Sequence, residues 1–148
     1  TYLRELVNHH ISGQMKIAPE HTEDRVLALM GKPGKQSLID FKKLFDKVNG
    51  TKENKKYLTY YLIAAHPGCD IKDMKNLKNF TTHELRINPE QAQIFTPTPG
   101  TYSAVMYYTG LDPKSKKPIF VEKNMTKKEE QKAIVVAKES FGKNSFSS

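Results

Sequence analysis

The chain has 148 residues, about enough for one domain with a buried core. Hydrophobic residues make up 37% of it and charged residues 27%, and no apolar run approaches the ~20 residues of a membrane-spanning helix. We therefore expect a soluble, cytoplasmic, globular protein that makes no contact with a membrane. The only cysteine, Cys69, cannot form an internal disulfide, and by itself it cannot hold an iron–sulfur cluster or a structural zinc.

The formal net charge of +8 indicates an anionic partner, which includes RNA and DNA. The positive charge is mostly lysine and is spread along the chain, for example at Lys42/Lys43, Lys55/Lys56 and Lys127/Lys128. A strong nucleic-acid signal would interleave basic residues with stacking aromatic residues. The pattern favours a solvated basic surface, and nucleic-acid binding is the alternative.

The chain opens with helical periodicity and then changes to a strand. Leu3, Leu6 and Val7 recur at helical spacing, which predicts a helix at the start of the chain. Residues 14–18 form a short apolar segment that ends at Pro19. We expect a buried strand there.

Two helices follow, each with a polar residue at its expected start. Thr22 is the predicted N-cap of a helix over residues 23–30. Ser37 and Asp40 resemble a capping box at the start of a second helix that runs to about residue 48.

The segment "YLTYYLIAA" at 57–65 does not alternate apolar with polar residues. A strand of this kind is typical of a parallel sheet with both faces covered. Asp70 comes shortly after it and is the predicted N-cap of a helix that begins at Ile71.

A third strand is predicted over residues 91–96, which prolines follow. The segment "GTYSAVMYY" at 100–108 fits either a helix or an extended segment. Residues 118–123 are a further short strand candidate.

The last predicted element is a helix over residues 127–138, opened by Thr126 and Glu129 as a T-x-x-E capping box. The polar residues 139–148 are expected to be a disordered tail. Strands that alternate with helices predict an α/β fold with a parallel sheet. Ligands of such folds gather where the carboxyl ends of the strands meet.

Three strand-end sequences carry a family resemblance: "GQMKIAPEHTEDRVLALMGKPG", "YLTYYLIAAHPGC" and "QIFTPTPGTYSAVMYYTGLDP". Together they closely resemble the radical S-adenosylmethionine (SAM) proteins of the YgiQ type, over about residues 2–132. The resemblance implies a partial (β/α)6 TIM-like barrel. Residues 1–110 would carry its last three parallel strands with flanking helices, and residues 111–138 would be a C-terminal extension.

The chain lacks two features of this family, the cluster loop and the glycine-rich turn after the second strand that contacts the SAM amino group. The family's C-x-x-x-C-x-x-C loop, which holds a 4Fe–4S cluster, has no counterpart here because Cys69 stands alone. The resemblance therefore implies the C-terminal half of a longer enzyme, truncated before Thr1, whose missing N-terminal half is its natural partner. The parent would cleave SAM reductively with its cluster, whereas this chain alone would be inactive and bind neither cofactor.

The resemblance leaves the parent's substrate and reaction unidentified, with RNA as one candidate substrate. The incomplete sheet would also expose an edge through which the chain could associate with itself. The alternative function, from a different class, is a non-enzymatic basic α/β module that binds RNA or DNA.

The resemblance also implies which side chains contact SAM. Lys16 would pair with its carboxylate, and Glu20 would accept from the ribose. The small side chains of Ala64 and Ala65 would let adenine approach, and the third strand would offer backbone contacts at Phe95 and Thr96. Each has a structural alternative: a solvated lysine, a helix-dipole partner for the glutamate, and ordinary close packing for the alanines.

His66 and Cys69 are the candidate catalytic residues. Their spacing resembles that of a metal pair, but zinc takes three or four ligands and the other histidines are scattered, so we expect no metal site. His66 is either a core histidine or a proton donor at the barrel mouth. Cys69 is either a thiol activated by a helix N-terminus or a buried, inert one.

Overall fold

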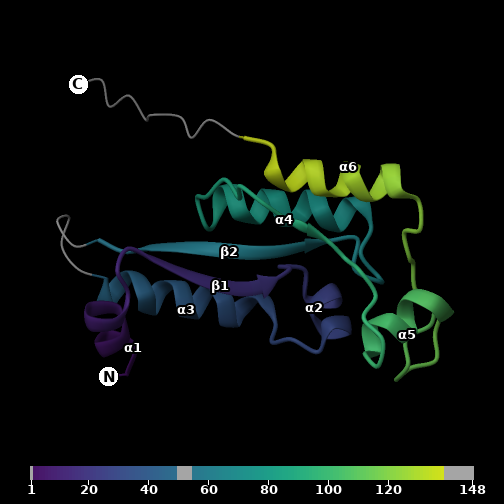
Figure 1. Ribbon diagram of the computed structural model, residues 1–148, viewed down its shortest axis with the longest axis horizontal. Coiled ribbons are helices and arrows are strands. Elements are labelled where there is room, and N and C mark those ends of the chain that lie inside the picture. The colour runs from purple at the N-terminus through teal and green to yellow at the C-terminus, as the bar shows by residue number, and fades with distance from the viewer. Residues whose placement is uncertain (1, 50–54, 139–148) are drawn as a thin grey trace.

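The computed structural model describes residues 2–49 and 55–138, and the expected tail at 139–148 lies outside them. Figure 1 labels the helices and strands. In chain order they are α1 (Tyr2–Glu5), the π-helical turn η1 (Leu6–His10), β1 (Gln14–Glu20), α2 (Asp24–Met30), α3 (Lys35–Val48), β2 (Tyr57–Ala64), α4 (Ile71–His83), β3 (Gln93–Ile94), α5 (Tyr102–Thr109) and α6 (Met125–Val136).

The three strands form one parallel sheet in the order β1-β2-β3, which confirms the predicted α/β fold with three parallel strands and flanking helices. The β3 ladder is much shorter than the predicted 91–96, since only Gln93 and Ile94 pair with β2. β1 runs past Pro19 to Glu20, with an irregular register after Ile17. Proline is tolerated there because β1 is an edge strand of the described sheet, so no neighbour needs the missing N–H.

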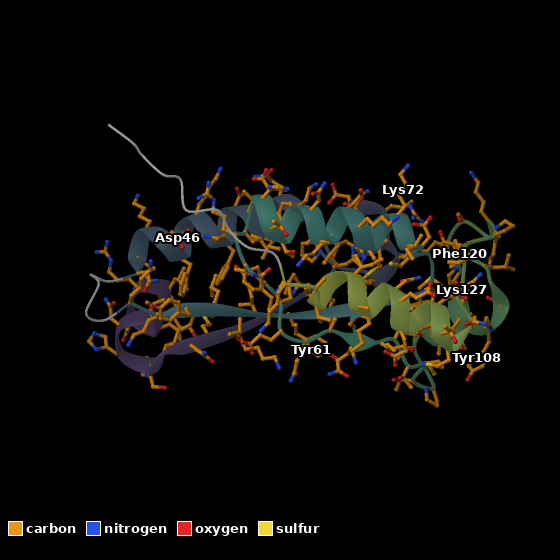
Figure 2. The ribbon with its side chains drawn as sticks, turned by 90° about the horizontal axis from the view of Figure 1, so that it is seen from above. Asp46, Tyr61, Lys72, Tyr108, Phe120 and Lys127 are labelled. Atoms are coloured by element: carbon orange, nitrogen blue, oxygen red, sulfur yellow. The ribbon has the colours of Figure 1, made fainter. Side chains whose placement is uncertain are left out.

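Helices cover only one face of this sheet in the described part of the chain. In Figure 2, α3 and α4 lie on the same side of the strands, and the labelled Tyr61 points away from them. The prediction that β2 is covered on both faces is therefore wrong, and Tyr57 is 60% exposed. In β1, Lys16 is exposed while Ile17 next to it is half-buried.

The main hydrophobic core lies between β2 and the helices that cover it. It combines side chains from α2, β2, α4 and α6 with two from the connecting segments: Val26, Leu62, Ala64, Cys69, Met74, Leu77, Ala92 and Val135. The last helix is therefore part of the same packed unit as the sheet. α6 packs against α4, β2 and β3.

One of the predicted caps is confirmed. The Asp70 carboxylate accepts from the backbone N–H of Asp73 at 2.9 Å, and the Asp73 carboxylate accepts from the backbone N–H of Asp70 at 2.9 Å. This capping box satisfies two of the free N–H groups at the start of α4. Asp73 also accepts a hydrogen bond from Arg25 of α2 at 2.5 Å, so the same carboxylate ties two helices together.

Two caps in the first half of the chain are wrong. The N-cap of α2 is Glu23 instead of Thr22, whose buried hydroxyl has no hydrogen-bond partner among the described residues. The Ser37–Asp40 box does not form, because α3 begins earlier, at Lys35. The backbone N–H of Lys35 donates to the carboxylate of Asp24 at 2.7 Å, a partner that lies in α2.

Near the C-terminus, Asn124 caps α6 by accepting from the backbone N–H of Lys127 at 3.1 Å, so the Thr126–Glu129 box is also wrong. The segment at 100–108, for which the sequence fits either a helix or an extended segment, contains the helix α5, and Thr101 caps this helix. Residues 118–123 form no strand, and Pro118 contributes only an isolated antiparallel bridge. None of the described helices is both long and apolar enough to cross a membrane.

Replacing Asp73 by alanine is expected to lower the free energy of unfolding by about 1–2 kcal/mol, because it removes a reciprocal cap and the partner of Arg25. Chemical denaturation measures the change. The matched control is Asp46→Ala, which removes a carboxylate from an exposed pair with Lys42 on α3 and should change stability by less than about 0.5 kcal/mol. Equal losses in the two variants would contradict the role assigned to Asp73.

Candidate functional site

The carboxyl ends of the three strands meet at one end of the sheet, and the backbone there is strained in two places. Glu20, at the end of β1, has φ 66°, and Ala65, directly after β2, has φ 59°. Left-handed backbone costs about 1–2 kcal/mol in a residue other than glycine. Strain of this kind clusters at functional sites, which makes this end of the sheet the candidate site.

His21 follows β1 and is fully buried. Its Nδ1 accepts from the backbone N–H of Glu23 at 3.0 Å, so in the neutral ring the proton lies on Nε2. Nε2 faces the Sγ atom of Cys69 at 3.4 Å and donates to it. Burial, together with the nearby His66 and Arg25, lowers the pKa of His21 to about 3, so the ring is neutral at physiological pH.

Cys69 is fully buried in the core, with its Sγ 3.3 Å from the Sδ atom of Met74. Burial raises the pKa of the thiol, and the carboxylate of Asp73 raises it further. The structure therefore favours the inert alternative over an activated thiol. The helix N-terminus does not lower the pKa, because Cys69 precedes the N-cap Asp70 and loses its hydration completely.

Gln131 of α6 reaches the end of β2 from the other side of the core. Its Oε1 accepts from the backbone N–H of Ala65 at 3.0 Å, and its Nε2 donates to the carbonyl of Cys69 at 3.4 Å. The glutamine therefore holds the turn that carries His66. Its sequence position gives no sign of this, since it is an ordinary polar residue within a helix.

His66 makes a contact that the sequence did not reveal. Its Nδ1 lies 2.9 Å from the carbonyl oxygen of Pro67, which can only accept, so the neutral ring carries its proton on Nδ1. Nε2 then accepts from the hydroxyl of Ser103 at 2.8 Å. Burial lowers the pKa of His66, which keeps the ring neutral. A serine hydroxyl on a neutral, oriented imidazole is a pair that can transfer a proton.

Ser103 lies on the wall of a groove of about 1050 Å³ between α2, α5 and the segment 112–120. The groove therefore adjoins the carboxyl end of β2 through the Ser103–His66 contact. A smaller cavity of about 250 Å³ lies between the end of β1 and α3, with His21 in its lining.

Of the two predicted SAM contacts in β1, only Glu20 lies at this end, whereas Lys16 lies in the amino-terminal half of the strand and pairs with Thr59 of β2. Lys16 projects from the face that no described helix covers, with its Nζ 5.4 Å from the centre of the Tyr61 ring. The carboxylate of Glu20 lies 3.5 Å from the Nζ of Lys32, so it is already paired. Their roles toward SAM stay predictions.

The other four predicted contacts are at the ends of β2 and β3. Ala64 and Ala65 are fully buried, and Ala64 belongs to the hydrophobic core. The Phe95 ring packs between His66 and Tyr107, with ring centres 5.0 Å and 5.8 Å apart, and Thr96 is exposed. The structure thus brings Ala65, His66 and Phe95 together.

Across residues 2–49 and 55–138, no three His, Cys, Asp or Glu side chains are grouped so that they could hold a metal ion. The two candidate residues His66 and Cys69 are directed at different partners, Ser103 and His21. They do not face each other as a ligand pair.

The chain is similar to UPF0313 proteins from several bacteria. It is 61% identical over 137 residues to an UPF0313 protein of Fusobacterium nucleatum subsp. nucleatum, 46% identical over 136 residues to one of Geobacter sulfurreducens, and 38% identical over 135 residues to one of Clostridium perfringens. These matches cover 91–93% of the chain but only 20–24% of the relatives' own length. No family model and no solved structure matches the chain.

The buried histidines are expected to make stability depend on pH. The pKa of His21 is about 3 in the folded chain and about 6.5 when unfolded, so between these values the unfolded chain binds a proton that the folded chain does not. The free energy of unfolding should therefore fall as the pH drops below about 6.5, by up to about 1.4 kcal/mol per pH unit for one such group. Denaturation at pH 7.5 and pH 5 measures this fall.

His21→Gln should show a smaller loss between the two pH values, whereas His83→Gln, at an exposed position on α4, should behave as the unchanged protein does. A His21 variant with the full pH dependence would disprove the assignment of a neutral, buried imidazole.

Proposed function

Because the chain belongs to the UPF0313 family, and because its strand-end sequences resemble radical SAM proteins of the YgiQ type, we propose that it is part of a radical SAM enzyme. The observation that supports this best is the sheet. Its three parallel strands lie in sequential order, with helices on one face and none of the described helices on the other. This is the arrangement of consecutive strands in a (β/α) barrel, whose inner face has no helices.

The residues of this chain do not fit the iron–sulfur cluster. Its one thiol, Cys69, is fully buried, has a raised pKa, and touches Met74 and His21. Ligands for the cluster would come from another part of a longer protein. The chemistry that SAM and the cluster supply together when bound is the reductive cleavage of SAM, which is the activity proposed for the longer protein.

The uncovered sheet face fits the part of SAM that the resemblance assigns to it. Lys16 is exposed there and has no carboxylate partner among the described ion pairs, so its ammonium is available to a carboxylate. Glu20 already pairs with Lys32 and would have to exchange this partner to accept from a ribose.

The end of β2 would position the ligand through its backbone. The carbonyl of Ala64 accepts from the N–H of Phe95 at 2.8 Å, and Gln131 holds the N–H of Ala65, so both strand ends are fixed before a ligand arrives. Ala64 packs in the hydrophobic core and Ala65 is fully buried, so neither side chain offers a surface to a base. Adenine would instead be held by backbone contacts near Phe95 and Thr96.

The Ser103–His66 pair would hold or move a proton. Ser103 lines the groove, and its hydroxyl proton points at the neutral Nε2 of His66. A proton taken from a group in the groove would pass through the hydroxyl to Nε2, while Pro67 holds the Nδ1 proton in place. Water has little access to the imidazole because the ring is buried.

The longer protein, reconstituted without oxygen with iron and sulfide and then reduced, is expected to convert SAM to 5′-deoxyadenosine and methionine. Chromatography of the reaction mixture measures both products. Lys16→Ala should weaken SAM binding by about tenfold or more, as expected for the loss of a charge-assisted contact. Lys43→Ala, on an exposed position of α3, is the control. A reconstituted protein that releases no 5′-deoxyadenosine would rule out the proposed activity.

A further inference from the structure

We propose that the groove between α2, α5 and the segment 112–120 binds a single-stranded polynucleotide. This goes beyond the proposed SAM chemistry and does not depend on it. It depends on the size of the groove, on the unpaired cations of its rim and on two exposed aromatic rings.

At about 1050 Å³ the groove lies at the upper end of the range of about 300–1000 Å³ that is typical of small-molecule pockets, so it has room for more than one nucleotide. Its segment 112–120 is attached to the end of β2, because the carbonyl of Phe120 accepts from the N–H of Gly68. A chain molecule lying in it would therefore pass next to the Ser103–His66 pair.

The rim carries more positive than negative charge, because Arg25, Lys114 and Lys117 share the lining with one carboxylate, Asp112. Lys114 and Lys117 line the groove, both are exposed, and neither takes part in the ion pairs found among the described residues. The nearby carboxylate, Asp112, accepts from the hydroxyl of Ser115 at 2.7 Å and from the backbone N–H of Lys114 at 3.0 Å. The hydrogen bond from Ser115, together with the backbone N–H and the charge of Lys114, lowers the pKa of Asp112. This carboxylate therefore offsets part of the charge of Lys114 and leaves Lys117 without a carboxylate partner among the described ion pairs.

This turn is well ordered. The N–H of Asp112 donates to the carbonyl of Lys117 at 2.9 Å, and the N–H of Lys116 donates back to the carbonyl of Asp112 at 2.8 Å. The lysines are thus presented from a closed turn, which limits the backbone entropy lost when an anion binds. Arg25 also lines the groove but is paired with Asp73.

Two aromatic rings in the same lining are exposed to solvent. Tyr102 of α5 is 73% exposed and Phe120 is 50% exposed. Figure 2 shows Phe120 at the α5 end of the molecule, where Lys127 and Tyr108 also lie. Exposed rings beside unpaired lysines can stack on bases while the cations contact phosphates, which is how proteins bind single strands without reading their sequence. A duplex hides its base faces, and an acidic peptide offers none.

Fluorescence anisotropy tests this with the longer protein and a labelled 15-nucleotide oligouridine RNA, its DNA counterpart and a duplex of the same length. Binding of either single strand, tighter than that of the duplex, is expected, and the RNA and DNA arms show which strand is preferred. Lys114→Ala with Lys117→Ala should weaken binding about tenfold or more at low salt. The slope of log K against log salt should fall by about 1.4, for two phosphate contacts.

Tyr102→Ala with Phe120→Ala should weaken binding about tenfold without changing the salt slope, because stacking releases no counterions. The matched control is Lys43→Ala with Lys47→Ala, which removes the same charge from two exposed positions on α3 that do not line the groove. Circular dichroism confirms that each variant is folded. Failure of SAM cleavage with binding intact would reject only the radical SAM proposal.

The inference is overturned if the groove lysines have no effect, or if the control variant weakens binding equally. It is also overturned if the duplex binds as tightly as the single strand, or if an oligoglutamate peptide displaces the RNA as well as unlabelled RNA does.

Discussion

The amide of Gln131 is the interaction on which the arrangement of the strand ends depends. It accepts from the N–H of Ala65 and donates to the carbonyl of Cys69, so one buried side chain of α6 satisfies two backbone groups of the turn after β2. Without it these groups would be buried without partners, at about 1–3 kcal/mol each. It also explains why a helix near the end of the chain belongs to the same core as the sheet: α6 holds the turn that carries His66 and Cys69.

The polar groups at this end stay buried because they stay neutral. Burial disfavours a charge on both His21 and His66, and His66 adds to this effect at His21. Each ring has a fixed tautomer, set by the N–H of Glu23 in one and by the carbonyl of Pro67 in the other. The result is one imidazole that donates toward the core thiol and another that accepts from the groove. Only the second is in a position to exchange a proton with a ligand.

Sequence reasoning found the features that are local or periodic. The parallel strands followed from apolar runs between helices, and Asp70 was found as the N-cap of α4, although its reciprocal partner Asp73 was not. Sequence reasoning failed where the partner of a residue is distant along the chain, or where two nearby residues could each cap the same helix. The residue that caps α3 is Asp24, eleven positions before Lys35, and Asn124 takes the place of Thr126 at the start of α6. Ser103 could not have been found, because 37 residues separate it from His66 and no motif links them.

The edge of β1 shows how an incomplete sheet can remain a usable scaffold. An edge strand with unpaired backbone groups can pair with further strands, and proteins limit such pairing with prolines, irregular register and charge. β1 has all three toward its carboxyl end: Pro19, the irregularity after Ile17, and the pair of Glu20 with Lys32. Residues 14–17 remain regular and pair fully with β2 on their other side. The amino-terminal half of β1 is therefore the regular part of this edge, whereas its carboxyl end is protected against further pairing.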